Sequence, residues 1–187
     1  YYYCAIASNT YRTGLGACRS LTTPAAAPST TTSSATSLTR TTGVLTAYAN
    51  PGGDATTGWF RYSTVNPGTC NDTFGTRAPA TGGSALGSGN SSVTFTQAIS
   101  GLAPATMYYY CALASNSMGT VLGTVLTFIT PASPTAMTLP ATAITNSSAT
   151  LNGTGNPNRA ATSGWFRYSL TNPGTCDDKF GSRAPVT

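Results

Sequence analysis

Apolar and polar residues alternate along several short stretches of this chain. The alternation is clear in residues 93–96, 108–114 and 149–153, and Gly, Pro, Asn and Ser separate such runs. A period of two is typical of strands that bury one face, and no stretch has a convincing helical period. About seven short strands in about 100 residues indicate a sandwich of two sheets, so we predict an all-β chain. The strands predicted for its middle part are 31–38, 42–49, 57–63, 72–77, 91–99, 106–115 and 120–130.

The chain also repeats itself. Residues 1–9 and 108–116 are the same except for one Ile-to-Leu change, at an offset of 107 residues. The hexapeptide Gly-Trp-Phe-Arg-Tyr-Ser occurs at 58–63 and again at 164–169, and each copy continues into Asn-Pro-Gly-Thr-Cys. These offsets are too long for a solenoid turn and match a tandem array of small domains.

Thr-Pro pairs and linkers divide the chain into three segments. Thr23-Pro24 and Thr130-Pro131 close equivalent stretches, and a linker rich in Ala, Ser, Thr and Pro follows each. We predict that residues 1–24 are the last strands of one repeat, 25–131 a complete repeat, and 132–187 the front of a third. Either identical repeats continue covalently beyond the chain or neighbouring copies complete one another, and we favour covalent continuation.

Composition narrows the functional class. Charged residues make up 7% of the chain, against about 25% in typical domains. The net charge of +5 comes from thinly spread Arg and reflects scarce acids, so we expect no nucleic-acid binding. With no His and no Glu, the commonest bases and metal ligands are missing, so we expect neither an enzyme nor a cofactor. No stretch approaches the roughly 20 apolar residues of a membrane span.

Cysteines recur at fixed places in the repeat. Cys70 corresponds to Cys176, and Cys4 corresponds to Cys111, whereas Cys18 falls where the next repeat has Val125. In a chain rich in Thr and Ser and poor in Lys, this usage favours an oxidising, extracellular setting.

One motif is more specific than the strand pattern. Residues 102–108 read Leu-Ala-Pro-Ala-Thr-Met-Tyr, and an alternating strand ending in Ala-Ser-Asn follows. This resembles the tyrosine corner and following strand of fibronectin type III domains, in which a buried Tyr pins the crossover between sheets. Residues 148–158 and Phe166-Arg167-Tyr168 resemble such repeats in large bacterial secreted and cell-surface proteins. The motif positions are Leu102, Pro104, Thr106 and Tyr108.

The chain departs from the animal members of that family. Their buried Trp lies on the second strand, where this chain has Leu45 and Leu151, and disulfides are not typical of them. The resemblance therefore implies tandem immunoglobulin-like sandwiches, one complete and two partial, but not the adhesive roles of animal relatives.

Strand parity then predicts a disulfide. If Tyr108 and Tyr110 point inward, Cys111 points outward, and in this fold the strand bearing Trp59 is its neighbour. The loop bearing Cys70 follows that strand and can fold over the same face. We predict that Cys70 bonds Cys111 and straps this loop across Trp59.

The remaining cysteines allow two pairings. Counting across the hairpin, Cys4 lies opposite Cys18, so they could form a cross-strand bridge. Alternatively, Cys4 bonds a loop cysteine of its own or a neighbouring repeat, such as Cys176, and Cys18 is left for an intermolecular bond. We slightly favour the second pairing.

The outward residues suggest one candidate binding face. An aromatic platform for sugar or for another subunit would use Trp59, Arg61, Tyr109, Trp165 and Arg167. Local cover with Arg stacked on a ring is the simpler interpretation. The acidic pair after Cys176 has only Asp72 in the other repeat, too few oxygens for calcium, so we expect no metal site.

Hydroxyl-rich stretches and sequons suggest attached sugar on a surface with few charges. The candidate glycosylation sites are Asn71, Asn90, Asn146, Asn152, Thr30, Thr31 and Thr32. We expect a structural module of an extracellular rod, stalk or filament on a bacterial surface, with adhesion or carbohydrate binding as the alternative.

Overall fold

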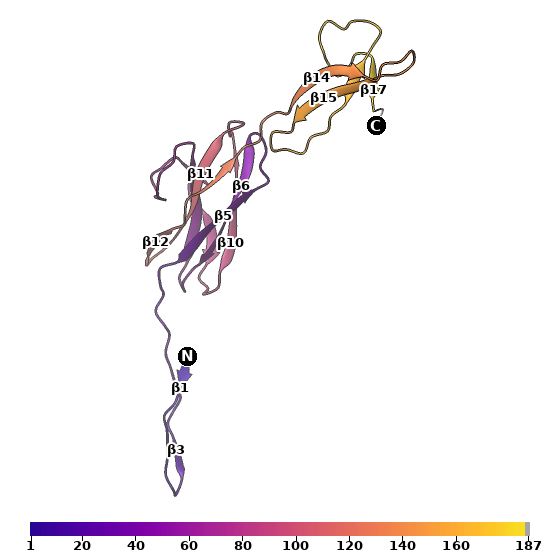
Figure 1. Cartoon of the computed structure of the whole chain (residues 1–187). Helices are drawn as coiled ribbons and strands as arrows, with labels where there is room; N and C mark the ends of the chain where they lie inside the picture. The colour runs from indigo at the N-terminus through magenta and orange to yellow at the C-terminus, as the bar shows by residue number, and fades with distance from the viewer. Residues whose placement is uncertain (186–187) are drawn as a thin grey trace. The chain divides into compact units, whose positions relative to one another are not determined.

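The computed structural model describes residues 1–185, and the described chain is all-β (Figure 1). Within these residues no helix is long and apolar enough to cross a membrane. By packing, residues 1–34, 45–97 and 108–127 form one compact unit, and residues 35–44, 98–107 and 128–187 form a second.

The middle of the chain folds into two sheets. The three-stranded sheet has the order β10-β6-β5, and the six-stranded sheet has the path β12-β11-β7-β8, with β13 on β11 and β9 on β7. This arrangement is sandwich-like, as the alternation predicts. The strands are β5 Ser29–Thr36, β6 Thr42–Asn50, β7 Thr56–Ser63, β8 Thr76–Ala78, β9 Ser84–Gly87, β10 Val93–Ser100, β11 Met107–Asn116, β12 Gly119–Leu122 and β13 Leu126–Ile129.

The core lies between these sheets because each strand turns its alternate side chains inward. Phe60 of β7 meets Phe95 of β10, with ring centroids 5.0 Å apart. Leu45 and Tyr110 are also fully buried. Burying such side chains stabilises the fold by roughly 1.5–3 kcal/mol each.

The observed strands differ from the predicted ones in three places. The predicted strand 72–77 is observed only as β8, Thr76–Ala78, and residues 72–75 lie in the loop before it. Residues 84–87 form β9, which was not predicted, and the predicted strand 120–130 is interrupted between β12 and β13. The interruption falls at Gly123, whose N–H donates to the Ala112 carbonyl. A Cβ on this glycine would collide with the Thr32 hydroxyl, so the backbone here must pass too close for any side chain.

Two hydrogen bonds join β5 to β11 across the interior. The Tyr110 hydroxyl donates to the Ser33 carbonyl at 2.7 Å, and the Ala112 N–H donates to the Thr32 hydroxyl at 3.1 Å. Because partly buried polar groups are costly when unpaired, these bonds fix the position of β5.

Leu102, Pro104 and Thr106 lie in the segment before β11, and Tyr108 lies at the start of that strand. Leu102 and Tyr108 are buried, and the Tyr108 ring packs 6.2 Å from that of Tyr62. The Thr106 hydroxyl donates to the Pro104 carbonyl at 2.8 Å. The Tyr108 ring thus packs inward.

The N-terminal segment, taken by itself, is a hairpin whose residues are exposed throughout 1–24. Its outer pair joins Tyr2–Tyr3 (β1) to Arg19–Ser20 (β4), and its inner pair joins Ile6–Ser8 (β2) to Thr13–Leu15 (β3).

The C-terminal segment contains two separate strand pairs. Thr135–Thr142 (β14) pairs with Thr150–Asn156 (β15), and Phe166–Tyr168 (β16) pairs with Ser182–Ala184 (β17). The second pair repeats the register of β7 with β8, since Phe166 faces Ala184 as Phe60 faces Ala78.

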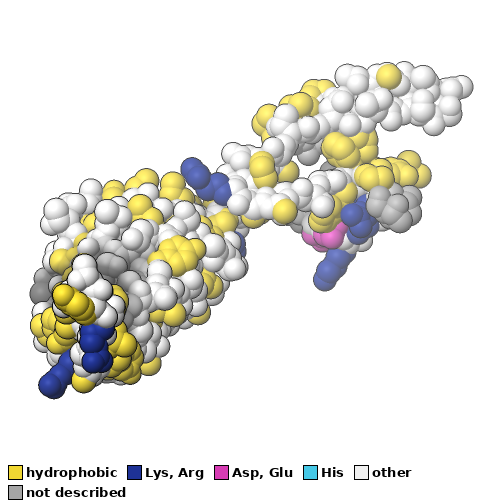
Figure 2. Space-filling view, turned by 90° about the horizontal axis from the view of Figure 1, so that it is seen from below, with side chains coloured by type: hydrophobic (Ala, Val, Ile, Leu, Met, Phe, Trp, Pro, Cys, Tyr) yellow, Lys and Arg dark blue, Asp and Glu magenta, His cyan; other side chains and the backbone are white. Residues whose placement is uncertain are grey.

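The surface carries few charges. Figure 2 shows mostly hydrophobic and uncharged polar groups on the visible face, with scattered Lys and Arg side chains. This matches nine basic and four acidic residues in the whole chain.

We predict that Tyr110→Phe lowers the free energy of unfolding by about 1 kcal/mol, because it removes only the hydroxyl bonded to Ser33. Urea denaturation followed by fluorescence measures the change. Tyr48→Phe, on an exposed ring, is the matched control and should have little effect. Equal stability of the two variants would contradict the assigned role of the hydroxyl.

Candidate functional site

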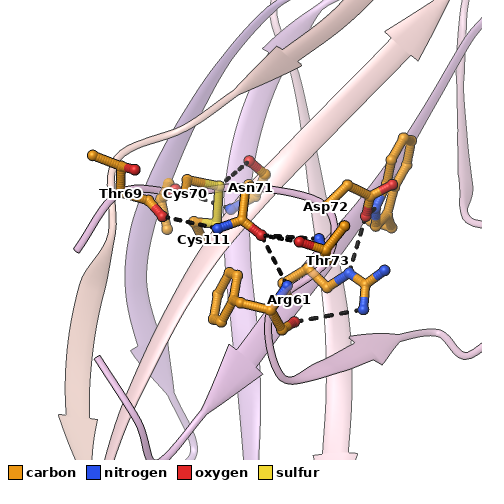
Figure 3. The surroundings of a disulfide bond; sticks show 11 residues. Arg61, Thr69, Cys70, Asn71, Asp72, Thr73 and Cys111 are labelled. Atoms are coloured by element: carbon orange, nitrogen blue, oxygen red, sulfur yellow. Dashed lines mark hydrogen bonds and ion pairs between the residues drawn. A yellow bond between two sulfur atoms is a disulfide. The ribbon is translucent and has the colours of Figure 1, made fainter. Parts of the chain in front are cut away.

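A disulfide joins a loop to the middle of the six-stranded sheet. Cys70 and Cys111 are bonded, with a Cα–Cα distance of 6.0 Å and a sequence separation of 41 (Figure 3). Cys111 lies in β11 and is fully buried, whereas Cys70 belongs to the loop after β7. We call residues 64–75 the strap loop. The bonded pair is the one that strand parity predicts.

Beneath the strap loop lies a small apolar cluster on the outer face of the sheet. Trp59, Cys111 and Leu113 form its buried centre. Leu113 pairs with Trp59 and Cys111 with Arg61 in the β7–β11 register, so these four side chains share one face. The partly buried residues packed against the centre are Cys70, Phe74 and Val125.

Two asparagines shape the strap loop. Asn66 accepts a hydrogen bond from the Gly68 N–H at 2.8 Å. Asn71 accepts from the N–H groups of both Thr73 and Phe74 at 2.9 Å. Such side-chain bonds to the backbone two or three residues on are typical of Asx turns, and here they position Cys70 and Phe74 over the sheet.

Asp72 connects the strap loop to β7 through its side chain. Its Oδ1 accepts from Trp59 Nε1 at 2.9 Å and from Arg61 Nε at 2.9 Å. The Arg77 guanidinium stacks over the Trp59 ring, 4.7 Å from the centroid. The Trp59 ring is thus bonded at its edge and covered on one face, and we call Trp59, Arg61, Asp72 and Arg77 the Trp–Asp–Arg cluster.

The surroundings of Asp72 favour its charged form. Burial by itself would raise the pKa of the carboxyl, but hydrogen bonds from Trp59 and Arg61 and the charges of Arg61 and Arg77 outweigh it. The pKa of Asp72 is therefore lowered from its ordinary value.

The same cluster recurs in the C-terminal segment. Asp178 Oδ1 accepts from Trp165 Nε1 at 2.7 Å and from Arg167 Nε at 3.1 Å. Arg183 stacks over the Trp165 ring at 4.6 Å. Hydrogen bonds from Trp165 and Arg167 lower the pKa of Asp178. The chain therefore builds one arrangement twice, 106 residues apart.

This geometry gives the side chains of the candidate binding face partners within the chain, as the simpler interpretation expects. Trp59 is only 7% exposed because the disulfide, Phe74 and Arg77 cover it, so it offers no free ring face. Arg61 is bonded to Asp72, and Tyr109 is half-buried. In the C-terminal segment Trp165 is 41% exposed, while Arg167 is bonded to Asp178. The recurring residues bind one another rather than lying open.

The acidic residues near Cys176 have protein partners. Asp178 holds Trp165 and Arg167, and Asp177 accepts from the N–H groups of Lys179 and Phe180. Among residues 1–185 no group of three or more His, Cys, Asp or Glu is placed to hold a metal ion.

One predicted glycosylation position is wrong. Thr32 is 5% exposed and its hydroxyl accepts the Ala112 N–H, so it is not accessible for attachment. Thr31, Asn90 and Asn146 are exposed, and Thr30 is half-buried. The amide nitrogens of Asn71 and Asn152 donate to the carbonyls of Thr69 and Pro140.

The other cysteines are not bonded in the structure. Cys4, Cys18 and Cys176 are free and exposed. Their pairing remains a prediction.

Sequence reasoning missed Arg77 and Phe74 and gave Asp72 no role in this cluster. A usable signal was present, because Asp72, Phe74 and Arg77 recur as Asp178, Phe180 and Arg183.

No protein-family model matches the chain, and no curated protein matches it. Two solved structures are similar to it, a short and a long form of the sensor domain of the anti-sigma factor RsgI4 in Pseudobacteroides cellulosolvens. The short form is 16% identical, with a TM-score of 0.39 over 55% of this chain and 93% of that chain. The long form is 13% identical, with a TM-score of 0.36 over 57% and 93%.

We predict that replacing both Cys70 and Cys111 by Ala lowers the free energy of unfolding by roughly 3–4 kcal/mol, because the closed loop of about 40 residues is released. Denaturation in urea measures the difference. The single change Cys176→Ala, at a free thiol, is the control. A loss below about 1 kcal/mol for the double variant would contradict a stabilising role of the bond.

We also predict that Asp72→Asn destabilises the protein at neutral pH and that this difference disappears in acid. The folded pKa of Asp72 is lowered, so its contribution is present above the unfolded value of about 4 and is lost as pH falls through the folded value. Urea midpoints between pH 7 and pH 2 measure this.

The control for Asp72→Asn is Asp177→Asn, since the corresponding position already holds Asn71. The Asp72 side chain is 45% exposed, so added salt should reduce the neutral-pH difference. A difference that persists unchanged at pH 2 would show that charge is not the cause.

Proposed function

We propose that this chain is a structural segment of an extracellular array of fibronectin type III-like repeats, such as a rod, stalk or filament at a bacterial cell surface. The observation that carries this proposal is the duplicated Trp–Asp–Arg cluster. In the central repeat the cluster braces a loop against its own sheet, and Trp59 is covered. The residues of the cluster recur in both copies, and in this proposal their role is to stabilise the fold of each repeat.

The strand arrangement supports the family resemblance. One sheet has the order β10-β6-β5, and the other contains β12, β11, β7 and β8, with the buried Tyr108 at the start of β11. A three-stranded sheet facing one built around such a central pair suits a fibronectin type III-like sandwich.

The covalent chemistry and the composition support an extracellular location. The Cys70–Cys111 disulfide persists only where thiols are oxidised. A chain with nine Lys and Arg in 187 residues also offers few sites to proteases that cleave after basic residues. In this proposal the partners are identical repeats, joined covalently or by self-association, and exposed Thr31, Asn90 and Asn146 carry any glycans.

Immunogold electron microscopy with an antibody raised against the full chain tests this function. We expect label along fibres or stalks outside the cell, because repeated rigid sandwiches add length. Label confined to the cell interior would overturn the proposal.

A glycan array probed with the full chain separates the structural role from adhesion. We expect no reproducible binding. Sugar binding that is lost in Trp165→Ala, whose ring is the more exposed of the two, and kept in Tyr48→Ala would favour adhesion instead.

A further inference from the structure

The N-terminal hairpin brings two free cysteines into register. Tyr1 and Leu21 exchange both backbone hydrogen bonds, each 2.8 Å long, so they form a hydrogen-bonded pair. Bonded and non-bonded pairs alternate along antiparallel strands. Tyr3 pairs with Arg19 two residues further on, so the continuation of this register brings Cys4 opposite Cys18 as a non-hydrogen-bonded pair. The register then shifts by one residue, because Gly16 bonds Ala5 and Ile6 pairs with Leu15, so the two cysteines lie at the end of the outer strand pair.

This type of pair has the geometry that a disulfide requires. Opposite residues in a non-hydrogen-bonded pair have Cα atoms about 4.5 Å apart and side chains on the same face. A disulfide spans Cα distances of about 4.4–6.8 Å. The usual spacing of such a pair therefore falls within the range that a disulfide spans.

The hairpin of the central repeat has the same backbone bond at the equivalent position. In it the Gly123 N–H donates to the Ala112 carbonyl at 2.8 Å, just as the Gly16 N–H donates to Ala5. Val125, which occupies the position of Cys18, packs against the cluster that contains Cys111. The side chains at these two positions thus belong to one apolar cluster in the repeat that has only one cysteine there.

We propose that Cys4 and Cys18 form a cross-strand disulfide within this chain. Both thiols are exposed, so a small-molecule disulfide such as oxidised glutathione can reach them. One cysteine thiolate attacks this reagent, giving a mixed disulfide and one free small thiol. The second cysteine thiolate then attacks the protein sulfur of the mixed disulfide and releases the second small thiol. Two protein thiols are oxidised and one small disulfide is reduced to two thiols.

With this bond, the disulfide of the N-terminal hairpin joins different elements from the disulfide of the central repeat. Cys111 holds the strap loop, whereas its counterpart Cys4 would hold the neighbouring strand of its own hairpin. This assignment reverses the pairing that sequence reasoning favours, and it is independent of the proposed structural function.

Non-reducing peptide mapping of the full chain tests the assignment. The protein is oxidised in a buffer of reduced and oxidised glutathione, blocked with iodoacetamide, digested with trypsin and measured by mass spectrometry. The five cysteines fall in five different tryptic peptides, 1–12, 13–19, 62–77, 78–159 and 168–179.

We expect peptide 1–12 to be linked to 13–19, peptide 62–77 to be linked to 78–159, and 168–179 to be alkylated. In Cys18→Val, which carries the residue of the central hairpin, peptide 1–12 should be alkylated instead. Cys4 linked to Cys176, or Cys4 and Cys18 both alkylated in the parent chain, would overturn the assignment. The 62–77 link reports correct folding in every sample.

Discussion

The pairing of β7 with β11 is the constraint on which the rest of the central repeat depends. Because side chains alternate across a strand, the register that sends Phe60 and Ala112 into the core also puts Trp59 and Leu113 on the outer face. An indole and a leucine side by side on an outer face leave a substantial apolar area in contact with water. The strap loop, the disulfide and Arg77 all cover this one area.

The chain has few charged side chains, and most of its carboxylates accept hydrogen bonds that hold segments of the fold together. Of the four Asp residues, Asp72 and Asp178 each hold a Trp and an Arg, and Asp54 accepts the hydroxyl and N–H of Ser117. An exposed ion pair alone contributes little. Here the same carboxylate oxygen also accepts a hydrogen bond from an indole N–H, which fixes the orientation of the Trp ring. The second Arg of the cluster can then stack on the face of that ring.

Much of this architecture could be predicted from periodicity and repetition. The alternation in 108–114 assigns Tyr110 to the core and Cys111 to the outer face, and the loop that follows the neighbouring strand supplies Cys70 as its partner. β9 and the break at Gly123 could not be predicted in this way. A short strand carries too little alternation to be recognised, and the alternation gives no sign of the close approach of Thr32 that leaves Gly123 no room for a side chain.

Comparing the two copies of the Trp–Asp–Arg cluster shows which interactions that hold the strap loop are local in sequence and which are long-range. In the C-terminal segment Trp165, Arg167 and Asp178 adopt the same bonds around a sheet formed only by β16 and β17. Those bonds span 11 to 13 residues, whereas the disulfide spans 41. Because closing a short loop costs less entropy than closing a long one, the local bonds can form first. They would then hold Cys70 over the sheet as β11 pairs with β7, so that oxidation secures a loop already in place.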